Sequence, residues 1–122
     1  MLFSPKIRNI LFLVFAVLTV LIAAYHFLAI FNKFDNSPAW RHFLFVGINL
    51  FCTYGVLKRP KYFVYFVAIL LVQQYYSHGA YLVNLWLEKG QIHLQSVFVL
   101  LLFPIALICL NEDRKLKKRK KQ

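Results

Sequence analysis

The chain of 122 residues is poor in acidic side chains: four Asp and Glu stand against fifteen Lys and Arg, which gives a formal net charge of +11. No acidic residue lies inside a long apolar run. This argues against a pump built on intramembrane carboxylates. A P-loop, an HExxH motif and a recognisable nucleophilic triad are also missing from the sequence. These absences give no support to the motif-based enzyme classes, and whether the chain is an enzyme is left open.

Cysteine is scarce as well. The two cysteines, Cys52 and Cys109, do not form a CxxC pair, and no CxxCH haem-attachment sequence is present. A disulfide framework and a covalently attached haem are therefore not indicated. Each thiol lies in a long apolar segment, so we expect both cysteines to be buried and structural.

Long apolar runs dominate what is present, since 61% of the residues are hydrophobic. Such a composition predicts one small integral membrane domain. We expect an all-α fold, an antiparallel up-down-up-down bundle of four membrane-spanning helices, because each apolar run is near the length that a spanning helix needs. The expected helices cover about 7–31, 38–57, 62–87 and 92–110, within a single domain of residues 1–113 that is followed by a basic tail, 114–122.

The basic residues are distributed unevenly between the two sides of this bundle. Twelve of the fifteen fall at the N-terminus, in the loop between the second and third runs, or in the C-terminal tail. The positive-inside rule then predicts that both termini are cytoplasmic in a multi-pass protein of the cell (inner) membrane. Next to a membrane helix a basic tail indicates contact with anionic lipid, and we expect no nucleic acid partner.

The first three runs each carry a face of small or polar residues at helical spacing. We expect these faces to point toward neighbouring helices, because small residues permit close approach and polar groups need partners in lipid. The faces contain Ala16, Thr19, Ala23 and His26 in the first run, His42, Asn49, Cys52 and Thr53 in the second, and Gln74, His78 and Tyr81 in the third.

Two residues predict local backbone features. Gly90 follows the third run and is a plausible helix stop. Pro104 lies inside the fourth run, where it removes one backbone donor. A membrane helix tolerates such a proline when a neighbour satisfies the freed carbonyl.

Each expected helix contains one histidine, namely His26, His42, His78 or His93. Each histidine is 16 to 18 positions from a cytoplasmic marker residue in its own helix. At the helical rise this corresponds to roughly 24 to 27 Å, so the four imidazoles are predicted to lie in one layer near the outer face.

This layer favours a binding site for a transition metal (Zn, Cu or Fe) or for one haem b, used in redox chemistry or metal handling. All four histidines are candidate metal ligands, and the deeper pair, His26 and His78, is the candidate axial pair for a haem. Residues expected to orient the rings or add ligands are Gln74, Tyr75, Tyr81, Asp35 and Glu88.

Two other functions stay open. Histidines near a membrane interface also serve as ordinary hydrogen-bond partners. The chain would then be a structural or accessory subunit of a larger membrane complex with no cofactor of its own. A third alternative is a small transporter or a lipid- or quinone-binding protein, which at four helices would require a homo-oligomer.

Overall fold

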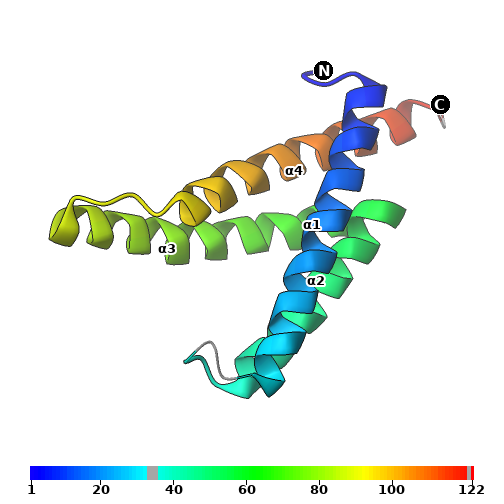
Figure 1. The fold of residues 1–122 in the computed structure, drawn as a ribbon. Coiled ribbons are helices and arrows are strands. Elements are labelled where there is room, and N and C mark those ends of the chain that lie inside the picture. The colour runs from blue at the N-terminus through cyan, green and yellow to red at the C-terminus, as the bar shows by residue number, and fades with distance from the viewer. Residues whose placement is uncertain (33–35, 121) are drawn as a thin grey trace. The chain divides into compact units, whose positions relative to one another are not determined.

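The computed structural model describes residues 1–32, 36–120 and 122, and this part of the chain contains four α-helices and no β-strand. The helices are α1 (Pro5–Phe31), α2 (Ala39–Lys58), α3 (Phe63–Lys89) and α4 (Leu94–Arg119) (Figure 1). The all-α prediction is confirmed. The chain divides into two compact units, Met1–Arg59 and Pro60–Gln122. Each unit is a hairpin of two helices, and their assembly into one four-helix bundle and one domain stays a prediction.

Most helix ends differ from the expected ones by one or two residues, and the end of α4 differs by nine. α2 begins at Ala39, because Pro38 has an extended backbone with ψ 147°. α4 continues to Arg119 and so includes most of the residues that the sequence assigned to a tail. This extension is rich in Lys and Arg, which are good helix formers. It also contains an ion pair at one-turn spacing, in which Lys117 Nζ lies 2.9 Å from the Asp113 carboxylate.

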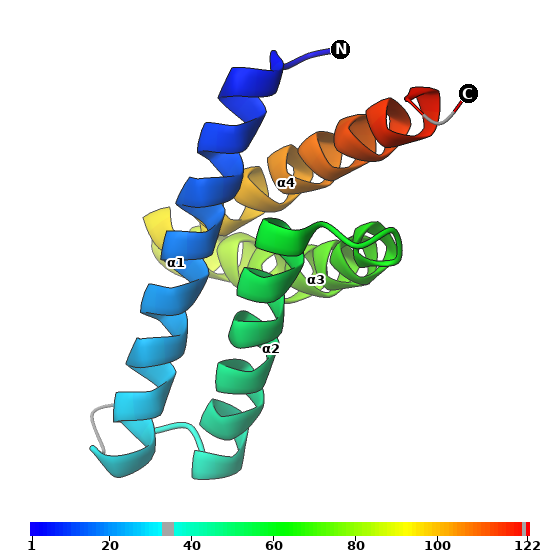
Figure 2. The same cartoon turned by 90° about the vertical axis from the view of Figure 1, so that its right-hand side faces the viewer.

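In the first hairpin, the face of small residues on α1 packs against α2, and Figure 2 shows the two helices side by side. Ala16 and Ala23 are buried on this face. Between them in sequence, the Thr19 hydroxyl lies 2.7 Å from the hydroxyl of Thr53 on α2. The sequence-based prediction that this face meets a neighbouring helix is therefore confirmed.

In the second hairpin, a side chain of α3 donates a hydrogen bond to the backbone of α4. Pro104 lies inside α4 and has no N–H to donate to the carbonyl of Leu100, four residues earlier. The Tyr75 hydroxyl of α3 donates to this same carbonyl, at 2.8 Å. The expected compensation for the proline is present and comes from a tyrosine side chain on the partner helix.

Long apolar side chains remain exposed along every helix. Examples are Leu21 of α1, Leu50 of α2, Ile69 of α3 and Leu101 of α4. In the described part of the chain, α1 and α4 are long and apolar enough to cross a membrane. The expectation that α2 and α3 also span rests on the sequence.

Replacement of Tyr75 by Phe removes the donor to the Leu100 carbonyl, so we expect it to lower the free energy of unfolding by about 1–2 kcal/mol. In a Pro104→Ala background, residue 104 regains an N–H for that carbonyl, and the cost of Tyr75→Phe should nearly vanish. Unfolding in detergent, followed by helical circular dichroism, measures both. Tyr76→Phe is the control, because Tyr76 is 81% exposed. Equal costs in the two backgrounds would contradict this account of the proline.

Gly90 ends α3 with a positive φ of 61°, as the sequence predicted. Gly90→Ala should lower the stability of the protein by about 1 kcal/mol, because an L-residue is strained in this conformation. Nothing lies within 4 Å of an added Cβ at Gly90 or at Gly79 inside α3. Gly79→Ala is therefore the matched control and should leave the melting temperature unchanged or raise it. A loss at Gly79 as large as that at Gly90 would refute the backbone explanation.

Candidate functional site

The first hairpin brings two of the four histidines into direct contact. His26 lies near the end of α1 and His42 near the start of α2, so the pair is at the loop end of the hairpin. The Nδ1 atoms of the two rings are 2.9 Å apart, and His42 is only 1% exposed. Two helices thus position a pair of imidazole nitrogens inside the hairpin.

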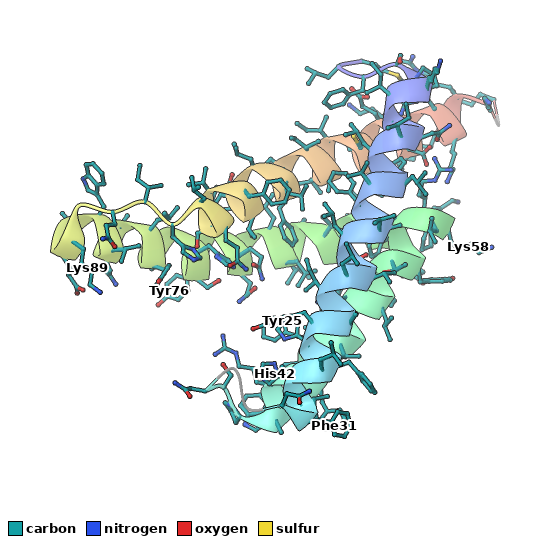
Figure 3. All side chains as sticks on the ribbon, viewed as in Figure 1. Tyr25, Phe31, His42, Lys58, Tyr76 and Lys89 are labelled. Carbon is teal, nitrogen blue, oxygen red and sulfur yellow. The ribbon has the colours of Figure 1, made fainter. Side chains whose placement is uncertain are left out.

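Aromatic rings hold this pair in place. Phe45, on α2, stacks on the His26 ring with centroids 4.9 Å apart and an interplanar angle of 16°. Tyr25 contacts the same imidazole edge-on, at 5.2 Å. Figure 3 shows Tyr25 and His42 at the loop end of the first hairpin. Aromatic rings therefore line part of the site, and the Arg41 guanidinium lies over the Phe45 ring, 5.7 Å from its centroid.

A distance of 2.9 Å between the two Nδ1 atoms means that one ring donates a hydrogen and the other accepts it. The two rings cannot both carry a proton on Nδ1 in this geometry, because two N–H groups would then face each other. The two rings therefore share one hydrogen atom: one Nδ1 carries it, and the lone pair of the other Nδ1 accepts it. A metal ion that accepts two lone pairs would replace this shared hydrogen.

The second hairpin joins the other two histidines through a hydroxyl group. Ser96 Oγ of α4 lies 2.9 Å from Nδ1 of His78 on α3 and 2.9 Å from Nδ1 of His93. His93 is the N-cap residue of α4, and its Nδ1 also accepts the Ser96 backbone N–H at 3.3 Å. The Ser96 side chain is fully buried.

Of the residues expected to support the histidines, one contacts a histidine ring and others have different partners. The Tyr81 ring packs edge-on against the His93 ring, with centroids 5.1 Å apart and an angle of 87°. The Tyr75 hydroxyl bonds to the backbone of α4, and the Gln74 amide donates to Gln73 at 2.6 Å. Glu88 is exposed near the end of α3. Asp35 lies outside the described residues.

The four histidines are divided equally between the two units. His26 and His78, the candidate axial pair for a haem, belong to different hairpins. In residues 1–32, 36–120 and 122, no group of three or more His, Cys, Asp or Glu side chains is placed to hold a metal ion. The four-histidine layer therefore stays a prediction from the sequence, and each pair is considered by itself.

Sequence reasoning did not identify Ser96 as the contact between two histidines. The spacing His93-x-x-Ser96 at a helix start is the signal that could have found it, because an N-cap side chain meets the third residue of its helix. The stacking of Phe45 on His26 had no distinctive signal, since the chain contains thirteen Phe residues.

The contact between His26 and His42 should show as energetic coupling. His26→Ala removes a partner from a buried imidazole, which we expect to cost about 1–3 kcal/mol of stability. Because both single variants lose the same bond, the His26→Ala/His42→Ala protein should be more stable than additivity predicts, by about 1 kcal/mol. Chelator-treated protein unfolded in detergent provides the measurement. Additive effects within about 0.5 kcal/mol would show that the bond contributes nothing.

No protein-family model matches this chain, and neither a curated protein nor a solved structure does. Arguments about function therefore start from the contacts described above.

Proposed function

We propose that this chain is a multi-pass membrane protein whose first hairpin binds a transition metal ion through His26 and His42. The observation that carries the proposal is the 2.9 Å separation of the two Nδ1 atoms, one on the buried His42 and one on the half-buried His26, whose ring stacks on Phe45. Imidazole suits zinc, copper and iron, and metal sites in helical proteins are built from inward side chains on facing helices.

The spacing of the nitrogens is close to what one metal ion needs. With metal–nitrogen bonds of about 2.0–2.1 Å, two ligands are about 2.9 Å apart at a right angle and about 3.4 Å apart at a tetrahedral angle. The observed 2.9 Å matches the first value, and small rotations of the rings reach the second. If the donor ring carried its proton on Nε2 in place of Nδ1, both rings would stay neutral and both Nδ1 lone pairs would be directed at the ion.

A haem does not fit between these two rings. Axial ligands on opposite faces of a haem iron are separated by two metal–nitrogen bonds, about 4 Å in total, with the macrocycle between them. The rings of His26 and His42 are too close for that arrangement. The proposal is therefore a metal ion without a macrocycle, held by two protein ligands. Its other coordination positions would accept ligands from outside the chain. Such open positions suit a protein that transfers a metal to a partner or uses it in catalysis.

His78 and His93 are not part of this proposed site. Their Nδ1 atoms are both hydrogen-bonded to Ser96, in the other hairpin. The proposed ligands are restricted to His26 and His42, and the four-ligand alternative becomes an outcome of the experiment below.

The membrane part of the proposal is supported by two kinds of residue. α1 and α4 have the length and apolar composition of spanning helices, and exposed apolar side chains on all four helices suit contact with lipid. The positive charge at both termini and in the loop between α2 and α3 favours a cytoplasmic location for these segments in the cell membrane. The basic end of α4 then contacts anionic lipid headgroups.

A metal titration of the purified protein tests the site. Chelator-stripped protein in detergent is titrated with Zn²⁺ and, separately, Cu²⁺, and the bound metal is quantified after gel filtration. We expect one tight equivalent per chain, and a dissociation constant at least about tenfold higher in His26→Ala and His42→Ala, since each variant loses one of two ligands.

His78→Ala is the matched control, because it removes a histidine from the other hairpin and should leave the affinity unchanged. Equal loss in His78→Ala would point instead to the four-histidine layer. Absence of a tight equivalent in the unmodified protein, or normal affinity in both His26→Ala and His42→Ala, would refute the proposal.

An accessory subunit is the second candidate, and the exposed aromatic side chains favour it. Tyr76 is 81% exposed and Trp86 57% exposed on α3, and aromatic residues are common anchors in protein interfaces. In this case Tyr76→Ala and Trp86→Ala would abolish co-purification with a larger complex, while the metal content would stay at background.

A further inference from the structure

We propose that His78, Ser96 and His93 form a proton relay in the second hairpin. The proposal goes beyond the metal site, because it concerns different residues in the other unit of the chain. It rests on a chain of three side chains in which the central hydroxyl is within hydrogen-bond distance of both imidazoles, at 2.9 Å each.

The contact between Ser96 and His93 fixes the direction of the hydrogen bonds. His93 Nδ1 accepts the Ser96 backbone N–H that begins α4, so this nitrogen carries a lone pair and no proton. The Ser96 hydroxyl, which has one hydrogen, therefore donates it to His93 Nδ1. Its oxygen then accepts a hydrogen from His78 Nδ1. The resting order is His78 Nδ1–H to Ser96 Oγ, and Ser96 Oγ–H to His93 Nδ1.

This order allows a proton to pass from one ring to the other, and His93 then releases the Ser96 backbone N–H until it returns to its starting tautomer. A proton that arrives at His78 Nε2 makes this ring a cation, and the ring passes its Nδ1 proton to Ser96 Oγ. Ser96 simultaneously gives its own hydroxyl proton to His93 Nδ1, and His93 releases its Nε2 proton. One proton has entered, one has left, and the serine is unchanged. Reversal of the ring tautomers restores the starting arrangement.

The central group of the relay is more buried than the two rings beside it. His93 lies at the start of α4 beside the connecting segment, residues 90–93, and is half-buried. His78 lies 11 residues before the end of α3, a rise of roughly 16 Å along the helix. Ser96 is fully buried between them, so bulk water does not exchange protons with the serine hydroxyl during the transfer. Both imidazoles contact the same Ser96 oxygen, so the relay is a local step between two half-buried rings, and the Tyr81 ring packs against His93.

Proton flux in liposomes tests the relay. Full-length protein is reconstituted around a pH-sensitive dye, and flux is driven by a potassium gradient with valinomycin. We expect flux above protein-free vesicles. Ser96→Ala, which deletes the bridging oxygen, should lower the protein-dependent flux by about a hundredfold, the low end of what a positioned proton-transferring group contributes. Ser96→Thr keeps the hydroxyl and should retain flux.

Ser77→Ala is the matched control. Ser77 is an exposed serine of α3 whose hydroxyl bonds only weakly to the Gln74 carbonyl, at 3.4 Å, so its loss should not change the flux. Circular dichroism of each variant separates loss of the relay from loss of the fold. Flux that is no higher than in protein-free vesicles, or that is equal in the original protein and in folded Ser96→Ala, would overturn the proposal.

Nitrogen NMR of ¹⁵N-histidine-labelled protein provides a second readout that does not depend on flux. At neutral pH we expect His78 to carry its proton on Nδ1 and His93 to carry its proton on Nε2. In Ser96→Ala the His78 tautomer should revert toward the Nε2-protonated form that free imidazole prefers. Protonation of His93 on Nδ1 in the original protein would contradict the proposed direction.

Discussion

The hydrogen bond between facing helices is the interaction on which this structure depends. The helices of each hairpin bury polar side chains such as His42 and Ser96 between them, and a buried polar group without a partner costs several kcal/mol. Each hairpin satisfies such groups with hydrogen bonds between its own two helices. The first joins α1 to α2 through Thr19 with Thr53 and through His26 with His42. The second joins α3 to α4 through Tyr75 with Leu100 and through Ser96 with His78.

The same requirement explains why the reactive groups occur where they do. A helix pair that needs polar contacts can use threonine or tyrosine, whose chemistry at neutral pH is limited to hydrogen bonding. At one contact in each hairpin the chain uses histidine, which also accepts a proton or binds a metal. These contacts between helices are therefore also the candidate functional sites, with two nitrogens in the first hairpin and a hydroxyl between two nitrogens in the second.

The sequence predicted the local features well, because they follow from spacing along one helix. The face of Ala16, Ala23 and His26 could be placed from helical periodicity, and Gly90 and Pro104 from their backbone chemistry. The end of α4 was missed because a run of basic residues was interpreted as a solvated tail. The structure shows that the intrinsic helix preference of this run, with the Asp113–Lys117 pair, continues the helix.

Contacts between helices were harder to predict, because they depend on the rotation of each helix about its axis. Histidine depth placed all four imidazoles in one layer and did not single out the pair of His26 and His42 that the structure brings together. It gave no indication that Ser96 would stand between His78 and His93, or that Tyr75 would bond to the backbone of α4 and not to a histidine ring. The joint layer of four imidazoles requires a placement of one hairpin against the other, which spacing within single helices does not determine.

X-ray absorption spectroscopy of the zinc-loaded protein tests the central claim most directly, because it reports the atoms bound to the metal. The account predicts two imidazole nitrogens at about 2.0 Å, with the outer-shell scattering typical of the ring, completed by oxygen or other exogenous ligands. Loss of the imidazole signal in the His26→Ala/His42→Ala protein would complete the assignment. A zinc shell without imidazole, or one that is unchanged in that double variant, would contradict it.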